Sequence, residues 1–107
     1  MGLATAQMRM IYLFISRLDL EYKITLITDA KMNLAQAVSD IVDVGTDLDA
    51  DEPLVRKLNA RKERLHVMEK QLDVQMAVYQ GKLNMINTEM DSCGKLVDEN
   101  IKRSFKY

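Results

Sequence analysis

Apolar side chains recur every three or four residues along the first stretch of the chain. No proline or glycine interrupts the residues from Leu3 to Val44. Steps of three and four average close to the period of an α-helix, so the pattern predicts one continuous helix over 3–44. The repeating positions are Ile11, Ile15, Leu18, Tyr22, Leu26, Ala30, Leu34, Ala37, Ile41 and Val44.

The pattern stops at VGTDLDADEP, residues 44–53. Gly45 is expected to end the first helix in the left-handed conformation, and the polar, acidic residues after it predict a turn over 45–52. Pro53 suits the first turn of a second helix, where its missing N–H costs nothing, and Asp51 or Glu52 is expected near the N-cap.

A second apolar series predicts a helix over 53–105. Its spacing is nearer 3.6 than 3.5 residues, so strong left-handed supercoiling is not expected. Gly81 and Gly94 inside it indicate either close helix approach or mild bending. The short connection predicts that residues 1–107 form a single all-α domain, a long antiparallel two-helix hairpin that resembles a coiled coil. The series contains Leu58, Leu65, Met68, Leu72, Met76, Tyr79, Leu83, Ile86, Met90, Cys93, Val97, Ile101 and Phe105.

Two antiparallel helices bury one stripe each, and this chain has more apolar residues than that. On the first helix the surplus is Met8, Met10, Leu13, Phe14, Leu20, Ile24 and Ile27, and on the second it is Val67, Val74, Val78, Met85 and Leu96. Exposed apolar surface on this scale marks an association face. The stretch MRMIYLFI, residues 8–15, is apolar on almost all sides, which favours burial between several subunits of a helical array.

The surplus yields a predicted subunit interface and a self-associating, homo-oligomeric protein. The interface residues are Met8, Met10, Ile11, Leu13, Phe14, Ile15, Leu20, Ile24, Ile27, Met85, Leu96, Ile101 and Phe105.

Charge and composition exclude several other partners. The chain of 107 residues has a net charge of −1, so nucleic acid is not expected. The apolar run near the N-terminus is too short to span a bilayer, and no signal-peptide cleavage pattern follows it. Acidic residues before the second helix and basic residues from Arg56 to Arg64 leave two interpretations of the turn. It is a solvated tip with local ion pairs, or a polar head that pairs with a neighbour and fixes the register.

Candidate chemistry is sparse, so no enzyme activity, metal or cofactor is expected. His66 is the only histidine, and a metal site needs several convergent ligands. Cys93 lies on the apolar stripe with no cationic cluster beside it, which favours a buried, inert thiol. No phosphate-binding loop or nucleophile motif occurs.

The turn DADEPL, with Pro53 opening the second helix, and the C-terminal segment KLVDENIKRSFKY resemble the needle proteins of type III secretion systems. These are small helical hairpins that are exported without a cleaved signal and stack into a hollow tube. The resemblance implies that Ile101 and Phe105 are packing residues and that Asn100, Lys102 and Arg103 face a lumen. A flagellin-like core, built from long terminal helices, is a related possibility. Small type VII secretion proteins are also hairpins, but their Trp-x-Gly turn and Tyr-x-x-x-Asp/Glu tail are missing from this sequence.

Together these features predict a structural subunit of a filament or tube, such as a needle-like secretion or surface appendage. The resemblance implies an extracellular or cell-surface location, and an export apparatus or chaperone as further partners. The alternative is a closed coiled-coil scaffold or adaptor in the cytoplasm that binds partner helices.

Overall fold

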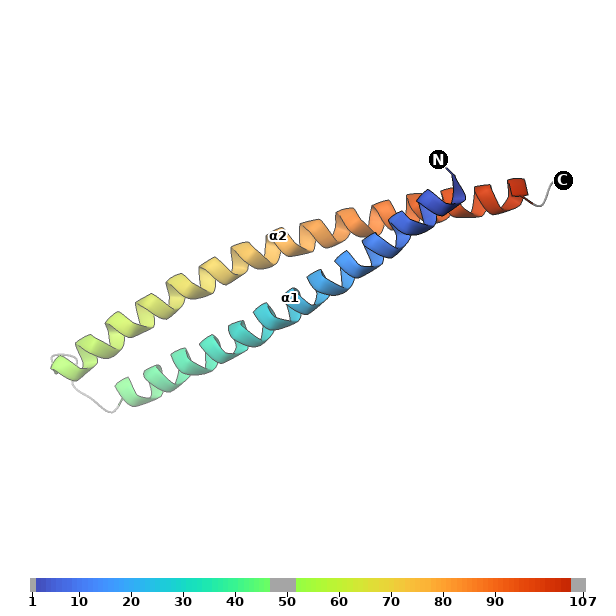
Figure 1. Ribbon diagram of the computed structural model, residues 1–107. Helices are drawn as coiled ribbons and strands as arrows, with labels where there is room; N and C mark the ends of the chain where they lie inside the picture. The colour runs from blue at the N-terminus through green and yellow to red at the C-terminus, as the bar shows by residue number, and fades with distance from the viewer. Residues whose placement is uncertain (1, 47–51, 105–107) are drawn as a thin grey trace. The chain divides into compact units, whose positions relative to one another are not determined.

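The computed structural model describes residues 2–46 and 52–104, and these residues form two long helices with no β-strand. Helix α1 spans Leu3–Gly45 and helix α2 spans Pro53–Ser104 (Figure 1). Both begin at the residues that the sequence predicts. Phe105, Asp51 and the acidic centre of the turn lie outside the described residues.

The end of α1 differs from the prediction in its conformation. Gly45 is the last helical residue, and no glycine in the described part of the chain has a positive φ. The expected left-handed stop is therefore wrong. The helical pattern is instead carried one residue further, since the Thr46 N–H donates to the Val42 carbonyl at 3.1 Å. At the start of α2, the Arg56 N–H donates to the Glu52 carbonyl at 3.3 Å, which places Glu52 at the N-cap.

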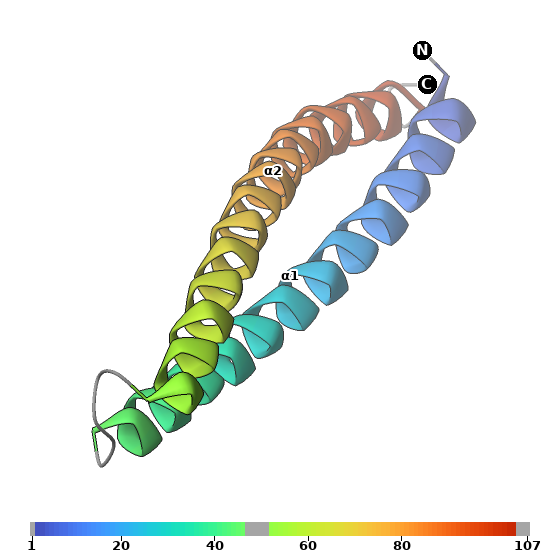
Figure 2. The same ribbon diagram turned by 90° about the vertical axis from the view of Figure 1, so that its left-hand side faces the viewer.

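The chain divides into two compact units, and each contains part of both helices. The first unit comprises Met1–Ile24 and Val78–Tyr107, and the second comprises Thr25–Ala77. Within each unit, a segment of α1 lies beside a segment of α2 that runs in the opposite direction (Figures 1 and 2). The predicted all-α fold, with two helices in an antiparallel hairpin, is confirmed.

The core of the first unit follows a seven-residue repeat. Ala6, Leu13 and Leu20 are buried on α1, and Cys93 is buried on α2. The Cys93 thiol donates to the Ala6 carbonyl at 3.2 Å, as expected of a buried, unreactive cysteine. Around this cluster pack the partly buried side chains of Met10, Ile86, Met90 and Val97.

The second unit has a thinner core because charged side chains occupy some of its inner positions. Ile27 and Val55 are its buried apolar residues. Lys31, at an inner heptad position, is half-buried, and its Nζ lies 2.5 Å from Asp73 Oδ1. Between them lie half-buried leucines and isoleucine at three- and four-residue spacing, which are Leu34, Ile41, Leu58, Leu65 and Leu72.

The predicted inner face of the N-terminal half of α1 is wrong. Ile11, Ile15 and Leu18 are exposed, whereas the residues assigned to the outside, Leu13 and Leu20, are buried. Tyr22 and Leu26 are likewise exposed, and Ile27 is buried. The pairing follows a heptad repeat, the spacing of supercoiled helices, rather than the period of 3.6 that was predicted.

The length of the hairpin explains which face of α1 packs inward. A face that contacts α2 must remain apolar throughout, and the heptad that contains Leu13, Leu20 and Ile27 continues through Leu34 and Ile41. The heptad that contains Met8, Ile15 and Tyr22 continues instead with Asp29, Gln36 and Asp43. Only the first series can serve both units.

Candidate functional site

The most prominent surface of the first unit is an apolar stripe on the side of α1 that faces away from α2. Its residues follow one another at steps of three and four, and we call them the outer stripe: Met8, Ile11, Ile15, Leu18 and Tyr22. Their exposed fractions range from 49% at Leu18 to 71% at Met8. Five adjacent apolar side chains are thus left largely in water.

The outer stripe exists because residues 8–22 carry two apolar heptads on one helix. The inner heptad turns Leu13 and Leu20 toward α2, and the outer positions follow from the helical rotation of about 100° per residue. Tyr12 and Phe14 are also exposed and widen the outer stripe on its two sides. The segment MRMIYLFI is therefore apolar on both faces, but its own chain covers only Met10 and Leu13.

Charged residues line the edges of the outer stripe. Arg9 Nη2 lies 2.6 Å from Glu89 Oε2, and its guanidinium lies 5.2 Å from the centre of the Tyr12 ring. Asp19 Oδ2 lies 2.9 Å from Lys23 Nζ. The hydrogen bond from Lys23 to this carboxylate, together with its negative charge, raises the pKa of Lys23 above its usual value. These exposed pairs define a polar border with charges of both signs.

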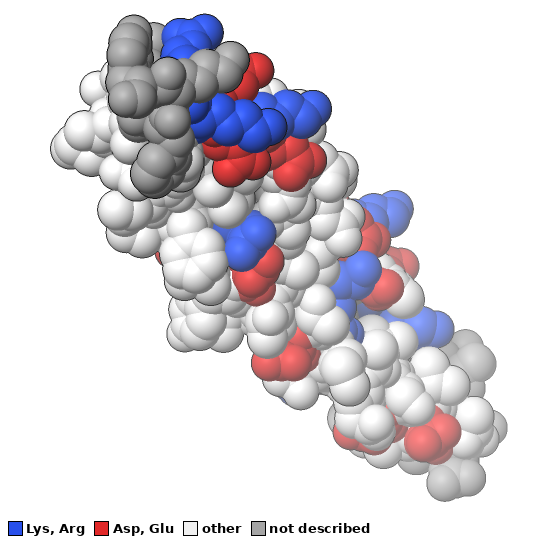
Figure 3. All heavy atoms as spheres, turned by 90° about the vertical axis from the view of Figure 1, so that its right-hand side faces the viewer, with Lys and Arg blue, Asp and Glu red and all other residues white. Residues whose placement is uncertain are grey.

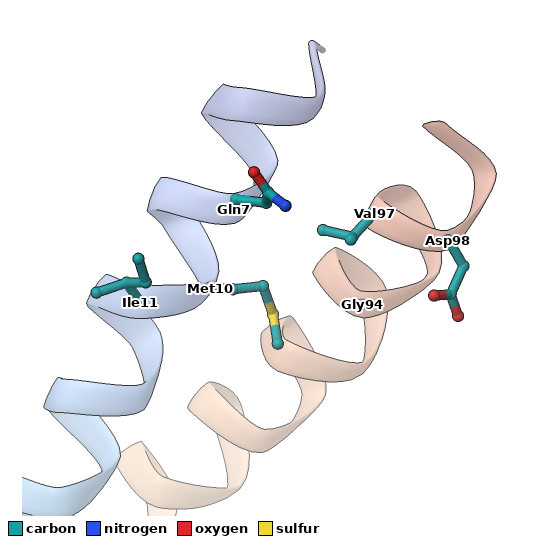
Figure 4. A pocket seen from close by; sticks show the side chains of 6 residues that line it. All are labelled: Gln7, Met10, Ile11, Gly94, Val97 and Asp98. Atoms are coloured by element: carbon teal, nitrogen blue, oxygen red, sulfur yellow. The ribbon is translucent and has the colours of Figure 1, made fainter. Parts of the chain in front are cut away.

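A shallow pocket of about 560 Å³ lies beside the outer stripe, between α1 and α2 of the first unit. Figure 4 shows Met10 and Val97 reaching between the two helices, with Gln7 above them and Ile11 directed away from α2. Gly94 presents no side chain, and a Cβ built there would meet no atom within 4 Å. The predicted close helix approach at Gly94 is thus wrong, and the same holds for Gly81.

Helix α2 carries a second apolar face, in the second unit. Val67, Val74 and Met68 are exposed there, on positions that point away from the inner heptad. Val78 and Met85 are exposed in the first unit. The predicted exposure of these four α2 residues other than Met68 is confirmed, whereas Met68 was expected on the inner stripe and lies outside it.

The predicted interface residues separate into three groups. Met8, Ile11, Phe14, Ile15 and Met85 are exposed, and Ile101 is at the margin of exposure. Met10, Ile24 and Leu96 are partly buried. Leu13, Leu20 and Ile27 are buried within their own hairpin, so they cannot be surface contacts in this conformation.

Sequence reasoning also missed three members of the exposed face, Tyr12, Leu18 and Tyr22. The signal that identifies them is the change from apolar to polar residues along their heptads after Tyr22. Of the residues predicted to face a lumen, Lys102 and Arg103 are exposed and Asn100 is half-buried. Phe105 lies outside the described residues.

Other candidate chemistry is limited in the part of the chain that the structure describes. His66 is exposed, with Nδ1 3.6 Å from Glu69 Oε2. Among residues 2–46 and 52–104, no three His, Cys, Asp or Glu side chains gather as metal ligands. No described helical segment is both long and apolar enough to cross a membrane. Figure 3 shows basic and acidic side chains next to one another, with uncharged side chains covering much of the remaining face.

Comparisons with known proteins add no family to this description. No protein-family model matches the chain, and no curated protein and no solved structure shows significant similarity to it.

Proposed function

We propose that this chain is a structural subunit that self-assembles through its apolar outer surfaces into a filament or tube. The observation that carries the proposal is the outer stripe, which leaves Met8, Ile15 and Tyr22 mostly exposed on a helix whose opposite face is already packed. Contiguous apolar surface of this kind is rare on monomeric proteins and marks interaction sites.

The energetic incentive to cover the outer stripe is large. Complete burial of a Leu, Ile or Phe side chain contributes roughly 1.5–3 kcal/mol. About half of the surface of Leu18 and more of the other four side chains is available for burial. The gross gain is therefore several kcal/mol for each copy, against which the loss of translational and rotational freedom must be set.

Open growth requires at least two contact surfaces on each copy, and the chain offers two on different helices. The outer stripe lies on α1 in the first unit, and Val67 and Val74 lie on α2 in the second unit. Contacts through two separate surfaces need not close into a ring, so they support a filament. The resemblance to secretion needle proteins supports the further proposal of a needle-like or surface appendage.

A closed coiled-coil adaptor is the second candidate, and the heptad repeat of the hairpin favours it. Such a protein would add a partner helix to the outer stripe and form a small complex of fixed size. The shallow pocket next to Ile11 offers an additional recess for a side chain of that helix.

Sedimentation velocity of the purified full chain, followed by negative-stain electron microscopy, tests the two candidates. For a filament subunit we expect the mean mass to rise with protein concentration and elongated particles to appear. For an adaptor we expect a small mass that does not change with concentration. A monomer that persists at tens of micromolar would contradict self-assembly.

Two matched substitutions connect this result to the outer stripe. Ile15→Asp places a charge at the centre of the stripe and should abolish assembly while circular dichroism still shows high helicity. Gln80→Asp adds the same charge at an exposed polar position on α2 of the first unit and should leave assembly intact. Equal losses with both variants would exclude a specific role for the stripe.

A further inference from the structure

We infer that the outer stripe binds the outer stripe of a second copy, antiparallel, about a twofold axis that passes beside Ile15. This inference rests on the proposed self-assembly and specifies one of its contacts. It commits to a second copy of this chain because the spacing and the charges of the stripe both fit its own reversed image.

The spacing of the stripe is nearly symmetric about its centre. Met8 precedes Ile15 by seven residues and Tyr22 follows it by seven. In an antiparallel pair, Ile15 meets Ile15 of the second copy, and Met8 meets Tyr22 at each end. Leu18 then lies beside Ile11 and Tyr12 of the second copy. Each layer combines large apolar side chains, as in the seam of an antiparallel coiled coil.

The charged border selects the antiparallel direction. At about 100° per residue, Asp19, Tyr12 and Arg9 lie on the same side of Ile15, while Glu21 lies on the other side. A twofold axis perpendicular to the helix brings like sides together. It therefore places Asp19 next to Tyr12 and Arg9 of the second copy, whose guanidinium already lies 5.2 Å from the centre of that tyrosine ring.

Parallel pairing would join unlike sides of the two helices at the same height. Asp19 would then approach the border that contains Glu21, and two carboxylates near each other at an apolar contact repel. The antiparallel arrangement instead offers Asp19 a hydroxyl donor and a guanidinium. The same acidic border opposes binding of the stripe to an anionic lipid surface, which a basic border would favour.

Cysteine cross-linking in a Cys93→Ser background tests both the partner and the direction. Cys93 is buried, and a serine hydroxyl can donate the same hydrogen bond to the Ala6 carbonyl, so the background should fold. In this background we would prepare Ile15→Cys, Met8→Cys and Tyr22→Cys and expose each to a mild oxidant at assembling concentrations.

For the antiparallel pair we expect Ile15→Cys to cross-link with itself. We also expect a mixture of the Met8→Cys and Tyr22→Cys proteins to form mixed dimers at least tenfold faster than either protein alone forms homodimers. The reason is distance, since residues 8 and 22 of one helix lie about 21 Å apart and would be brought together only between copies. The single-variant reactions are thus matched controls.

Homodimers of Met8→Cys formed faster than the mixed dimers would show parallel pairing and overturn the inference. Absence of all cross-links in samples that sediment as assemblies would also overturn it, while leaving self-assembly through another surface. A monomeric Cys93→Ser parent together with a monomeric unsubstituted protein would contradict both proposals. Repeating the sedimentation with each cysteine variant reduced identifies any substitution that itself prevents assembly, in which case the remaining positions decide the direction.

Discussion

Leu13 and Ile15 are two residues apart on α1 and lie on opposite faces of it. Leu13 is 2% exposed, whereas Ile15 is 59% exposed. Leu13→Ala should lower the free energy of unfolding by about 3 kcal/mol, because it removes buried methyl groups and leaves a cavity. Ile15→Ala should lower it by less than about 1 kcal/mol under the same conditions. Urea titration monitored by circular dichroism at a concentration below assembly measures both values.

The same pair of variants should reverse its order in an assembly measurement. Ile15→Ala removes part of the proposed contact and should raise the concentration needed for assembly more than Leu13→Ala does. If Ile15→Ala destabilised the dilute protein as much as Leu13→Ala, the face of α1 that contacts α2 would have been assigned incorrectly.

Arg17 is a charged residue at an inner heptad position of the first unit. Its Nε is buried without a hydrogen-bond partner and lies 3.7 Å from Glu21 Oε1, an ion-pair contact too long for a hydrogen bond. A buried donor without a partner costs about 1–3 kcal/mol. Arg17→Leu should therefore raise the urea midpoint, since it removes this cost and adds apolar volume to the core. Arg17→Lys, which keeps the charge and loses the guanidinium stacked 5.3 Å from the centre of the Phe14 ring, should not raise it.

At the scale of the elements, Gly94 is a weak point in α2. Glycine within a helix is about 1 kcal/mol less favourable than alanine. Because a Cβ at position 94 meets nothing within 4 Å, Gly94→Ala should increase the free energy of unfolding by about that amount, and Gly81→Ala should do the same. Thermal unfolding of both variants provides the measurement. A lower melting temperature for Gly94→Ala alone would indicate that the helices approach more closely there than the structure shows.

The limits of the helices could be predicted from sequence because local chemistry determines them. The uninterrupted run after Leu3 and the restraint that Pro53 places on φ identify the first residue of each helix without reference to any distant residue. The inner face of α2 was also largely predictable, since most of its apolar residues lie in a single stripe.

The inner face of α1 could not be predicted from local periodicity because residues 8–22 present two apolar faces. The choice between Leu13 and Ile15 depends on α2, and on Asp29 and Asp43, which make one heptad unsuitable further along the hairpin. The candidate site was consequently predicted in part. An apolar excess at residues 8–15 was recognised, but Leu13 was placed on the surface and Tyr22 in the core.

At the scale of the whole molecule, the two exposed apolar faces predict two separable steps of assembly. If the outer stripe joins copies in pairs, Val74→Asp on α2 should leave those pairs intact and prevent further growth, because it charges only the second face. Ile15→Asp should instead eliminate the pairs that form through α1. Light scattering coupled to size-exclusion chromatography distinguishes the two, with a fixed dimer expected for Val74→Asp over a range of concentrations. A protein that combines both substitutions should remain a helical monomer, and higher masses from it would reveal a third contact surface, the exposed Val78 and Met85 of α2 being the first residues to test.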